Sequence, residues 1–218
     1  MTTIAITDAA LALAAGQPWK SVTLDALVAA AGMGLADFSA FAASRQDVLR
    51  LIARRFDQQL LASLQSDPVE GEPHDRLFDI MLRRIEQLAP HKPAIASIMK
   101  DPADGPAAWL HLLSSVMETQ NWILIAAKLE ASGTRGELQK LGLAKVYADT
   151  LKIWLDDDDA GLARTMAALD RKLRDSAAMT DRLERPLSIF ASVCNALKAA
   201  NDIRRDRARP QGSDAPAA

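Results

Sequence analysis

The chain has 218 residues, with 26 lysines and arginines against 28 aspartates and glutamates, so the whole protein carries no excess positive charge that would attract nucleic acid. The single cysteine, Cys194, excludes an internal disulfide and a cysteine-rich metal site, and it favours a reducing compartment. No uncharged stretch is long enough to cross a bilayer, and the N-terminus lacks the basic residues of a signal peptide, so we expect a cytoplasmic protein.

The N-terminal segment shows helical periodicity from its first turns. Apolar residues recur at helical spacing up to Gly16, and Pro18 stops that first helix. Thr23 is expected to cap a second helix over residues 24–31, and Gly32 supplies the tight turn that follows. Strand signals are almost absent here and further along the chain. The pattern therefore indicates an all-α protein.

A short helix at residues 35–42 and a long helix after it complete this N-terminal region. The sequence Ser44-Arg45-Gln46-Asp47 resembles a capping box, with aspartate in place of the usual glutamate, and it predicts the start of the long helix. Two short helices joined by a glycine turn are typical of a helix-turn-helix head. We assign the head to residues 1–48 and a connecting helix to residues 49–66.

A linker precedes a larger helical C-terminal domain, which we assign to residues 75–176. The linker, residues 67–74, contains two prolines, one glycine and three acids. A long helix is expected at residues 107–131, and the capping box Thr134-Arg135-Gly136-Glu137 predicts the start of a second one. The acidic turn at residues 156–159 leads into the next helix, whose N-terminus its carboxylates would cap.

The end of the chain predicts an amphipathic helix at residues 186–203 and a basic disordered tail at 204–218. An apolar helix face that ends in arginines can lie on an anionic membrane, so residues 186–209 are a candidate for peripheral membrane contact. The same face can instead pack on the body of the protein or on a partner subunit. The apolar face consists of Leu187, Phe190, Val193, Cys194 and Leu197.

Two segments of the N-terminal sixty residues carry a family resemblance, ITDAALALAAGQPWKSVTLDALVAAAGMG and SRQDVL at 44–49. They are similar to the first two helices and to the opening of the fourth helix in the TetR family of transcriptional regulators. The resemblance implies a TetR-like all-α fold, a homodimer and binding to a DNA operator. The residues that match the family's pattern in the second helix are Thr23, Leu27, Ala30, Ala31 and Gly32.

The helix expected to read DNA departs from the family's pattern. Asp37 and Ser39 stand where family members usually have a threonine and a tyrosine, and residues 34–43 contain no lysine or arginine. A carboxylate facing phosphates is repelled, and a missing cation forfeits counterion release. The helix is therefore either a recognition helix or a packing remnant that no longer reads DNA. The candidate DNA contacts are Lys20, Thr23, Leu35, Asp37, Ser39, Ser44 and Arg45.

A second resemblance rests on three segments of the C-terminal domain: residues 76–95, the region around Trp122, and above all residues 142–173. They resemble the TetR-like accessory proteins of ubiquinone biosynthesis, which bind lipid and not DNA. The same pattern occurs in proteins described as TetR-type regulators, so it marks a family more than a function. This resemblance implies an alternative in which the protein handles an isoprenoid-like lipid and has lost DNA binding.

Apolar faces on the helices at 107–131 and 137–155 could line a ligand pocket for an apolar small molecule or lipid. The alternative is that they form an ordinary core and a dimer interface. The TetR resemblance implies a homodimer through the last two helices of the domain. The candidate pocket residues are Trp109, Leu113, Met117, Trp122, Tyr147 and Trp154.

No motif in the sequence indicates catalysis, a cofactor or a metal. His74, His91 and His111 lie in different segments without ligand spacing. The acidic turn at 156–159 lacks the alternating ligands and glycine of a calcium loop. We therefore expect no enzyme, but a dimeric TetR-type regulator that senses an apolar small molecule, with the lipid-binding accessory protein as the alternative.

Overall fold

The computed structural model describes residues 2–100, 105–179 and 182. This part of the chain is helical and contains no β-strand, which confirms the predicted all-α class. Two 3-10 turns, Trp19–Ser21 and Ala89–His91, connect helices, and a last helix covers residues 163–179. The labelled helices are α1 (Thr2–Gly16), α2 (Leu24–Ala30), α3 (Leu35–Ser39), α4 (Arg45–Ser66), α5 (Pro73–Leu88), α6 (Lys92–Lys100), α7 (Gly105–Ala126) and α8 (Gly133–Leu155).

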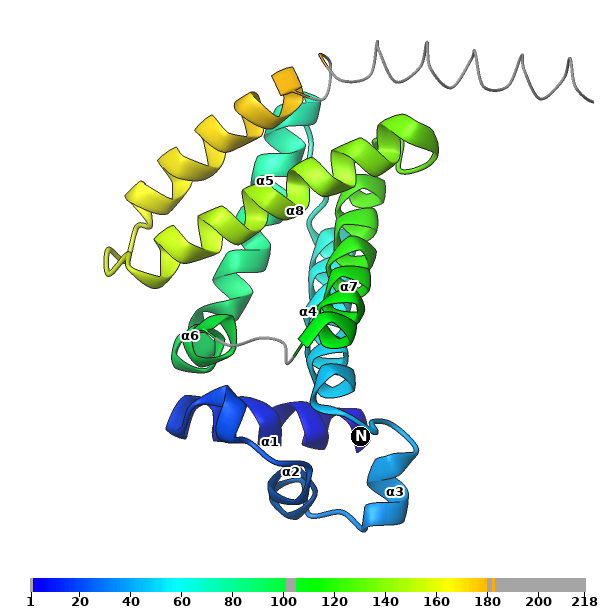
Figure 1. Ribbon diagram of the computed structural model, residues 1–218. Helices are drawn as coiled ribbons and strands as arrows, with labels where there is room; N and C mark the ends of the chain where they lie inside the picture. Colours follow the sequence, from blue (N-terminus) through cyan, green and yellow to red (C-terminus); the bar gives the residue numbers. More distant parts are fainter. Residues whose placement is uncertain (1, 101–104, 180–181, 183–218) are drawn as a thin grey trace, which may run out of the picture.

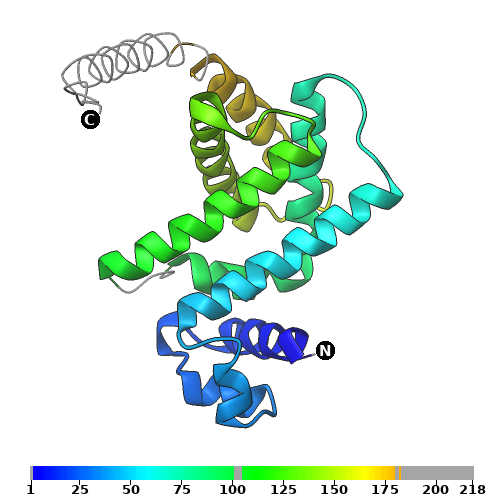
Figure 2. The same cartoon turned by 90° about the vertical axis from the view of Figure 1, so that its right-hand side faces the viewer.

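Helices α1, α2 and α3 form a head at one end of the molecule, and α4 runs from this head into the C-terminal helices (Figures 1 and 2). The predicted caps are confirmed: the Thr23 hydroxyl accepts from Ala26 N at 3.2 Å, and Ser44 Oγ accepts from Asp47 N at 3.1 Å. Gly32 has a φ of 63°, a left-handed conformation that suits glycine after a helix. Local signals in the sequence thus fix both ends of α2 and the start of α4.

The third helix is shorter than predicted, because α3 ends at Ser39 and not at residue 42. The Ser39 hydroxyl donates to Ala36 O at 2.7 Å, a local bond that competes with helix continuation. Phe38 turns into the head core, whereas Phe41 in the following turn is 41% exposed. Of these two phenylalanines, Phe38 therefore contributes to the head core and Phe41 remains largely outside it.

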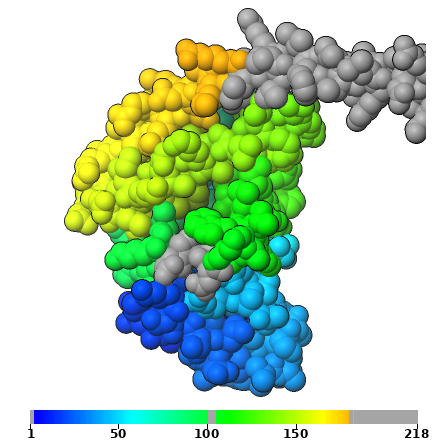
Figure 3. Space-filling model, viewed as in Figure 1, coloured from blue at the N-terminus to red at the C-terminus, as the bar shows by residue number. Residues whose placement is uncertain are grey.

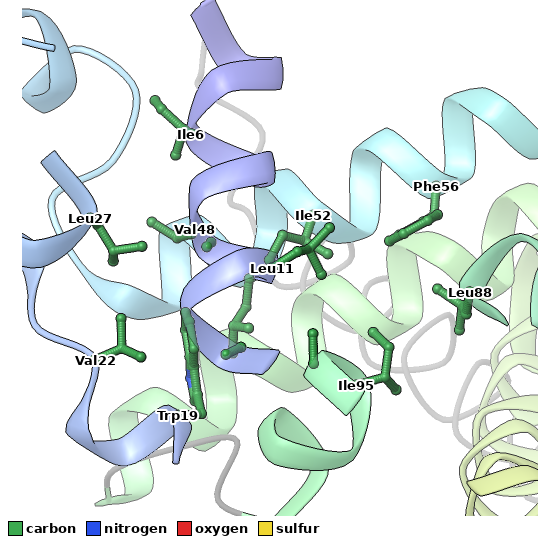
Figure 4. Packing of buried hydrophobic residues seen from close by; sticks show 14 of the residues in the cluster. Ile6, Leu11, Trp19, Val22, Leu27, Val48, Ile52, Phe56, Leu88 and Ile95 are labelled. Carbon is green, nitrogen blue, oxygen red and sulfur yellow. The ribbon is translucent and has the colours of Figure 1, made fainter. Parts of the chain in front are cut away.

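One continuous apolar core joins the head, which is coloured blue in Figure 3, to the helices packed on it (Figure 4). Ile6, Leu27 and Val48 from the head belong to the same cluster as Leu88 and Ile95 from α5 and α6. The Ser97 hydroxyl on α6 also accepts from Trp19 N at 2.9 Å and donates to Gln17 O at 3.0 Å. The head is therefore packed against the C-terminal helices as well as joined to them through α4.

A second apolar core lies further from the head. It brings together Leu60 of α4, Ile80 of α5, Leu124 of α7, Leu143 of α8 and Leu169 of the 163–179 helix. Among the described residues, no helix has the length and apolarity needed to cross a membrane. Helices α4, α5 and α8 each contribute side chains to both cores, so all three connect the two ends of the molecule.

Two predicted boundaries around the α7–α8 turn are wrong. Helix α7 ends at Ala126 and not at residue 131, since Lys128 adopts a left-handed φ of 57°. Helix α8 begins at Gly133 with Ser132 as its N-terminal flanking residue, so Thr134 lies inside the first turn and does not cap the helix. A Cβ at Gly136 would collide with the Ala131 backbone, and this close approach is what the small residue permits.

Candidate nucleic-acid interface and ligand pocket

Helix α3 lies at the outer end of the head, away from the C-terminal helices (Figure 1). Its first turn exposes Leu35, which is 67% accessible, together with Asp37. Phe41 adds a further apolar side chain just beyond the helix. This end of the head therefore offers a short helix with an exposed apolar and acidic surface.

The seven predicted DNA contacts divide into two groups. Lys20, Leu35 and Asp37 are exposed and point outward from the head. The side chains of the other four form hydrogen bonds within the protein. Thr23 and Ser44 cap helices, Ser39 donates to Ala36 O, and Arg45 turns inward. Arg45 Nη1 donates to Trp19 O at 2.7 Å, and its guanidinium carbon lies 6.0 Å from the centre of the Trp19 ring.

The charge on this surface is weakly suited to a polyanion. Asp37 and Asp25 are both exposed, and each lies in the first turn of its helix, where the helix dipole favours a carboxylate. Lys20 is an exposed cation near them in the sequence. Since phosphate contacts supply most of the affinity for DNA, the head has few of the groups that normally provide it.

A contact between the head and α7 was not predicted from the sequence. His111 Nε2 on α7 lies 3.5 Å from Asp47 Oδ1 at the start of α4. Asp47 Oδ2 also accepts from the Ser44 hydroxyl at 2.8 Å and from Ala43 N at 3.1 Å. Burial raises the pKa of Asp47, but these hydrogen bonds and the nearby His111 lower it by more. The pKa of Asp47 therefore lies below its usual value.

A charged cluster that the sequence analysis also missed lies inside the C-terminal domain. Asp57 and Arg84 are both buried and form an ion pair, and the Thr119 hydroxyl donates to Asp57 Oδ2 at 3.0 Å. Burial raises the pKa of Asp57 in spite of the opposing effect of Arg84, and burial likewise raises the pKa of the Tyr147 hydroxyl. The cluster ties α4, α5 and α7 together.

A pocket of about 450 Å³ opens between α5, α7, α8 and the 163–179 helix. Its wall is largely leucine, including Leu124, Leu143 and Leu173 from three of these helices. Polar side chains from Glu72, His74, Arg135 and Gln139 also line it. The volume falls within the usual range for a small-molecule site, roughly 300–1,000 Å³.

None of the six predicted pocket residues lines this pocket. Trp109, Leu113 and Trp122 are exposed on α7, and Met117 is partly buried there. Trp154 belongs to the core shared with the head, and Tyr147 packs between the two cores. Helical periodicity predicted apolar faces on α7 and α8, but it could not show which leucines enclose an empty space.

The acidic turn caps the following helix, as predicted. Asp157 Oδ2 accepts from Thr165 N at 2.9 Å and from its hydroxyl at 2.7 Å, and Asp159 Oδ2 accepts from Ala163 N at 3.2 Å. Within residues 2–100 and 105–179, no group of three histidine, cysteine, aspartate or glutamate side chains is placed to hold a metal. The predicted helix at 186–203, Cys194 and the tail at 204–218 lie outside the described residues.

Comparisons with known proteins support this architecture. No family model matches the chain, and no curated protein matches it. Among solved structures, a TetR transcriptional regulator from Rhodococcus sp. RHA1 is similar with a TM-score of 0.63 and 13% identity, over 79% of this chain and 93% of that one. The TetR transcriptional regulator from Nitrosomonas europaea ATCC 19718 also has a TM-score of 0.63, with 19% identity, over 81% of this chain and 98% of that one.

These similarities show that the chain has the TetR-like all-α fold. At such identities a structural likeness establishes the fold, and function has to be argued from the residues of this chain. The similarity of residues 76–95 and 142–173 to the accessory proteins of ubiquinone biosynthesis rests on the sequence alone.

Proposed function

We propose that this protein is a TetR-type transcriptional regulator, a homodimer that binds an operator through its heads and senses an apolar small molecule in its C-terminal domain. The observation that carries this proposal is the position of α3, a helix preceded by a glycine turn and exposed at the outer end of the head. In helix-turn-helix proteins the second helix of the pair enters the major groove, which needs such an exposed position.

Helix α4 provides a route from the C-terminal domain to the head. Val48 and Ile52 in its first half belong to the head core, and Leu60 belongs to the core that contains Leu124 and Leu143 of the pocket. A ligand that displaces those leucines would therefore shift α4 and with it the head. In a dimer, such a shift changes the spacing of the two reading helices, which must match the operator half-sites.

The test is a gel-shift or filter-binding measurement with the DNA that flanks the protein's own gene, at several salt concentrations. A regulator should prefer this DNA over an unrelated fragment, and its affinity should fall as salt rises. The affinity for DNA should decrease only weakly with salt concentration, because few cations on the head face the phosphates. Equal, weak binding to both fragments would contradict the proposal.

A second candidate function is a cytoplasmic TetR-like accessory protein that binds an isoprenoid-like lipid and no longer binds DNA. Two observations favour it: the exposed carboxylate of Asp37 on α3, and the leucine-lined pocket. Organic extraction of the purified protein, followed by mass spectrometry, tests this alternative. A bound isoprenoid together with an absence of specific DNA binding would support it over the regulator.

A further inference from the structure

We propose that the pocket between α5, α7, α8 and the 163–179 helix binds a neutral amphiphile with a single chain, whose hydroxyl or amide group bonds to Gln139. This inference deepens the proposed sensing function by naming its site and ligand class. Binding can be measured without DNA, so the inference can fail or hold independently of operator binding.

The interior of the pocket suits an apolar chain. Leu77 and Leu129 line the cavity and are only partly buried, so they offer it hydrocarbon surface, and the buried Leu124, Leu143 and Leu173 form the apolar wall behind them. At about 450 Å³ the cavity lies in the lower part of the range for small-molecule sites, so it holds one chain and not a two-chain lipid. Burying that chain supplies the main favourable free energy, roughly 0.8 kcal/mol per methylene group.

Gln139 provides the polar contact. Its side-chain Oε1 is buried without a hydrogen-bond partner among the described residues, and the residue lines the pocket. Buried polar atoms in folded proteins nearly always have a partner, so this atom calls for one from outside the chain. A hydroxyl both donates and accepts, and it therefore pairs with the amide of Gln139 in either orientation of that amide.

The charges around the pocket favour a neutral head group. Glu72 and Arg135 line it with opposite charges, and Asp170, whose Oδ1 lies 2.9 Å from His74 Nε2, forms an ion pair with Arg174 at 2.8 Å, so the charges around the pocket offset one another. An ionised head group would lose its hydration on entry without gaining a counter-charge. A fatty alcohol, or an alcohol or amide with an isoprenoid chain, fits these constraints better than a carboxylate or an amine does.

The experiment measures binding of decan-1-ol, decanoate and decylamine to the full-length protein at pH 7 by isothermal titration calorimetry. We expect decan-1-ol to bind at least tenfold more tightly than either charged compound. Gln139→Leu should weaken decan-1-ol binding about tenfold, since the hydroxyl then loses its partner. Leu129→Trp, a partly buried residue of the pocket wall, should abolish binding by filling the space.

Gln87→Leu is the matched control. Gln87 is also partly buried with an unpartnered buried Oε1, but it lies near the other end of α5, outside the pocket. It should leave the affinity for decan-1-ol unchanged, and circular dichroism should show that all three variants fold.

Three results would overturn the inference: no binding of decan-1-ol, equal affinities for the alcohol and the charged compounds, or equal effects of Gln139→Leu and Gln87→Leu. If decan-1-ol binds as expected but specific DNA binding is absent, the pocket assignment holds and the regulator proposal fails. If DNA binds specifically but decan-1-ol does not, the pocket assignment fails and the regulator proposal holds.

Discussion

Arg84 on α5 and Asp57 on α4 form an ion pair inside the C-terminal domain, with Nη1 and Oδ1 2.5 Å apart. Both side chains are buried, and Thr119 of α7 donates its hydroxyl to the second carboxylate oxygen at 3.0 Å. The guanidinium carbon of Arg84 also lies 5.7 Å from the centre of the Tyr147 ring on α8. Four helices of the domain therefore meet at one charged pair.

Replacing Arg84 with methionine should lower the free energy of unfolding by about 3–5 kcal/mol, because it leaves a buried carboxylate without its counter-charge. Burial already raises the pKa of Asp57, so the folded state holds this proton more tightly than the unfolded state does. Stability from such a group is present at low pH and is lost as pH rises through the folded pKa. Because Arg84 lowers the pKa of Asp57, its removal raises this pKa further. The loss of unfolding free energy in Arg84→Met should therefore be larger at pH 7 than at pH 4, as measured by urea unfolding.

Arg54→Met provides the control for this prediction. Arg54, which like Asp57 lies on α4, pairs with Glu118 of α7 at 3.2 Å, but both side chains are substantially exposed. An exposed pair contributes at most about 1 kcal/mol. If Arg84→Met costs no more than Arg54→Met, the buried pair does not have the structural role assigned to it. The double variant Asp57→Leu/Arg84→Met should recover most of the lost stability.

The sequence predicted those parts of the fold that depend on neighbouring residues. The caps by Thr23 and Ser44 and the turn at Gly32 each rest on a signal within a few positions, and the structure confirms all three. The cap assigned to Thr134 is wrong, because the helix starts two residues earlier, at Gly133, and Gly136 allows its first turn to approach Ala131 closely.

The interior sites depend on residues far apart in the chain and could not be predicted in this way. Asp57 lies between arginines and glutamines, a context typical of a solvated helix face, and it is buried only because Arg84 and Thr119 pack against it. The pocket likewise depends on tertiary packing, because it is the space left where leucines from separate helices do not contact one another. Periodicity shows which face of a helix is buried, but not how tightly two such faces pack.

On the head, Asp37→Asn should strengthen binding to the operator several-fold, because it removes a carboxylate that repels phosphate from the exposed face of α3.

Lys20→Gln should weaken binding to the operator and make the dependence of the affinity on salt shallower, since one phosphate contact is lost. Filter binding at a series of salt concentrations measures both changes.

Asp79→Asn is the control, because it makes the same change in net charge at an exposed position on α5, outside the head. It should leave the affinity for DNA unchanged. An equal gain from Asp37→Asn and Asp79→Asn would mean that only the net charge of the protein matters and that α3 does not face the DNA.

For the proposed dimer through α8 and the 163–179 helix, Leu141→Arg should dissociate the protein into monomers. Leu141 is 52% exposed on α8, and a charge there would be buried without a partner in the interface. Size-exclusion chromatography with light scattering gives the oligomeric state. Leu110→Arg is the comparison, since Leu110 is 69% exposed on α7. Dissociation by Leu110→Arg alone would place the interface on α7 instead.

The hydrogen bonds from Thr165 lower the pKa of Asp157 below its ordinary value of 3.8. A carboxyl group with a lowered folded pKa contributes stability above its unfolded pKa, and that contribution is lost as pH falls through the folded pKa. Asp157→Asn should therefore lower the melting temperature at pH 7, and its difference from the wild type should shrink below about pH 3.8. Thermal unfolding followed by circular dichroism at pH 7, 5 and 3 measures this.

The neighbouring Asp158 makes the test specific to the cap. Its side chain is fully exposed, and it approaches only Lys92 at 3.6 Å, whereas Asp157 holds both the backbone N and the hydroxyl of the fully buried Thr165. Asp158→Asn removes the same charge from the same turn and should leave the melting temperature unchanged at every pH. If the two variants lose stability equally, the effect comes from the charge of the turn and not from the hydrogen bonds that start the 163–179 helix.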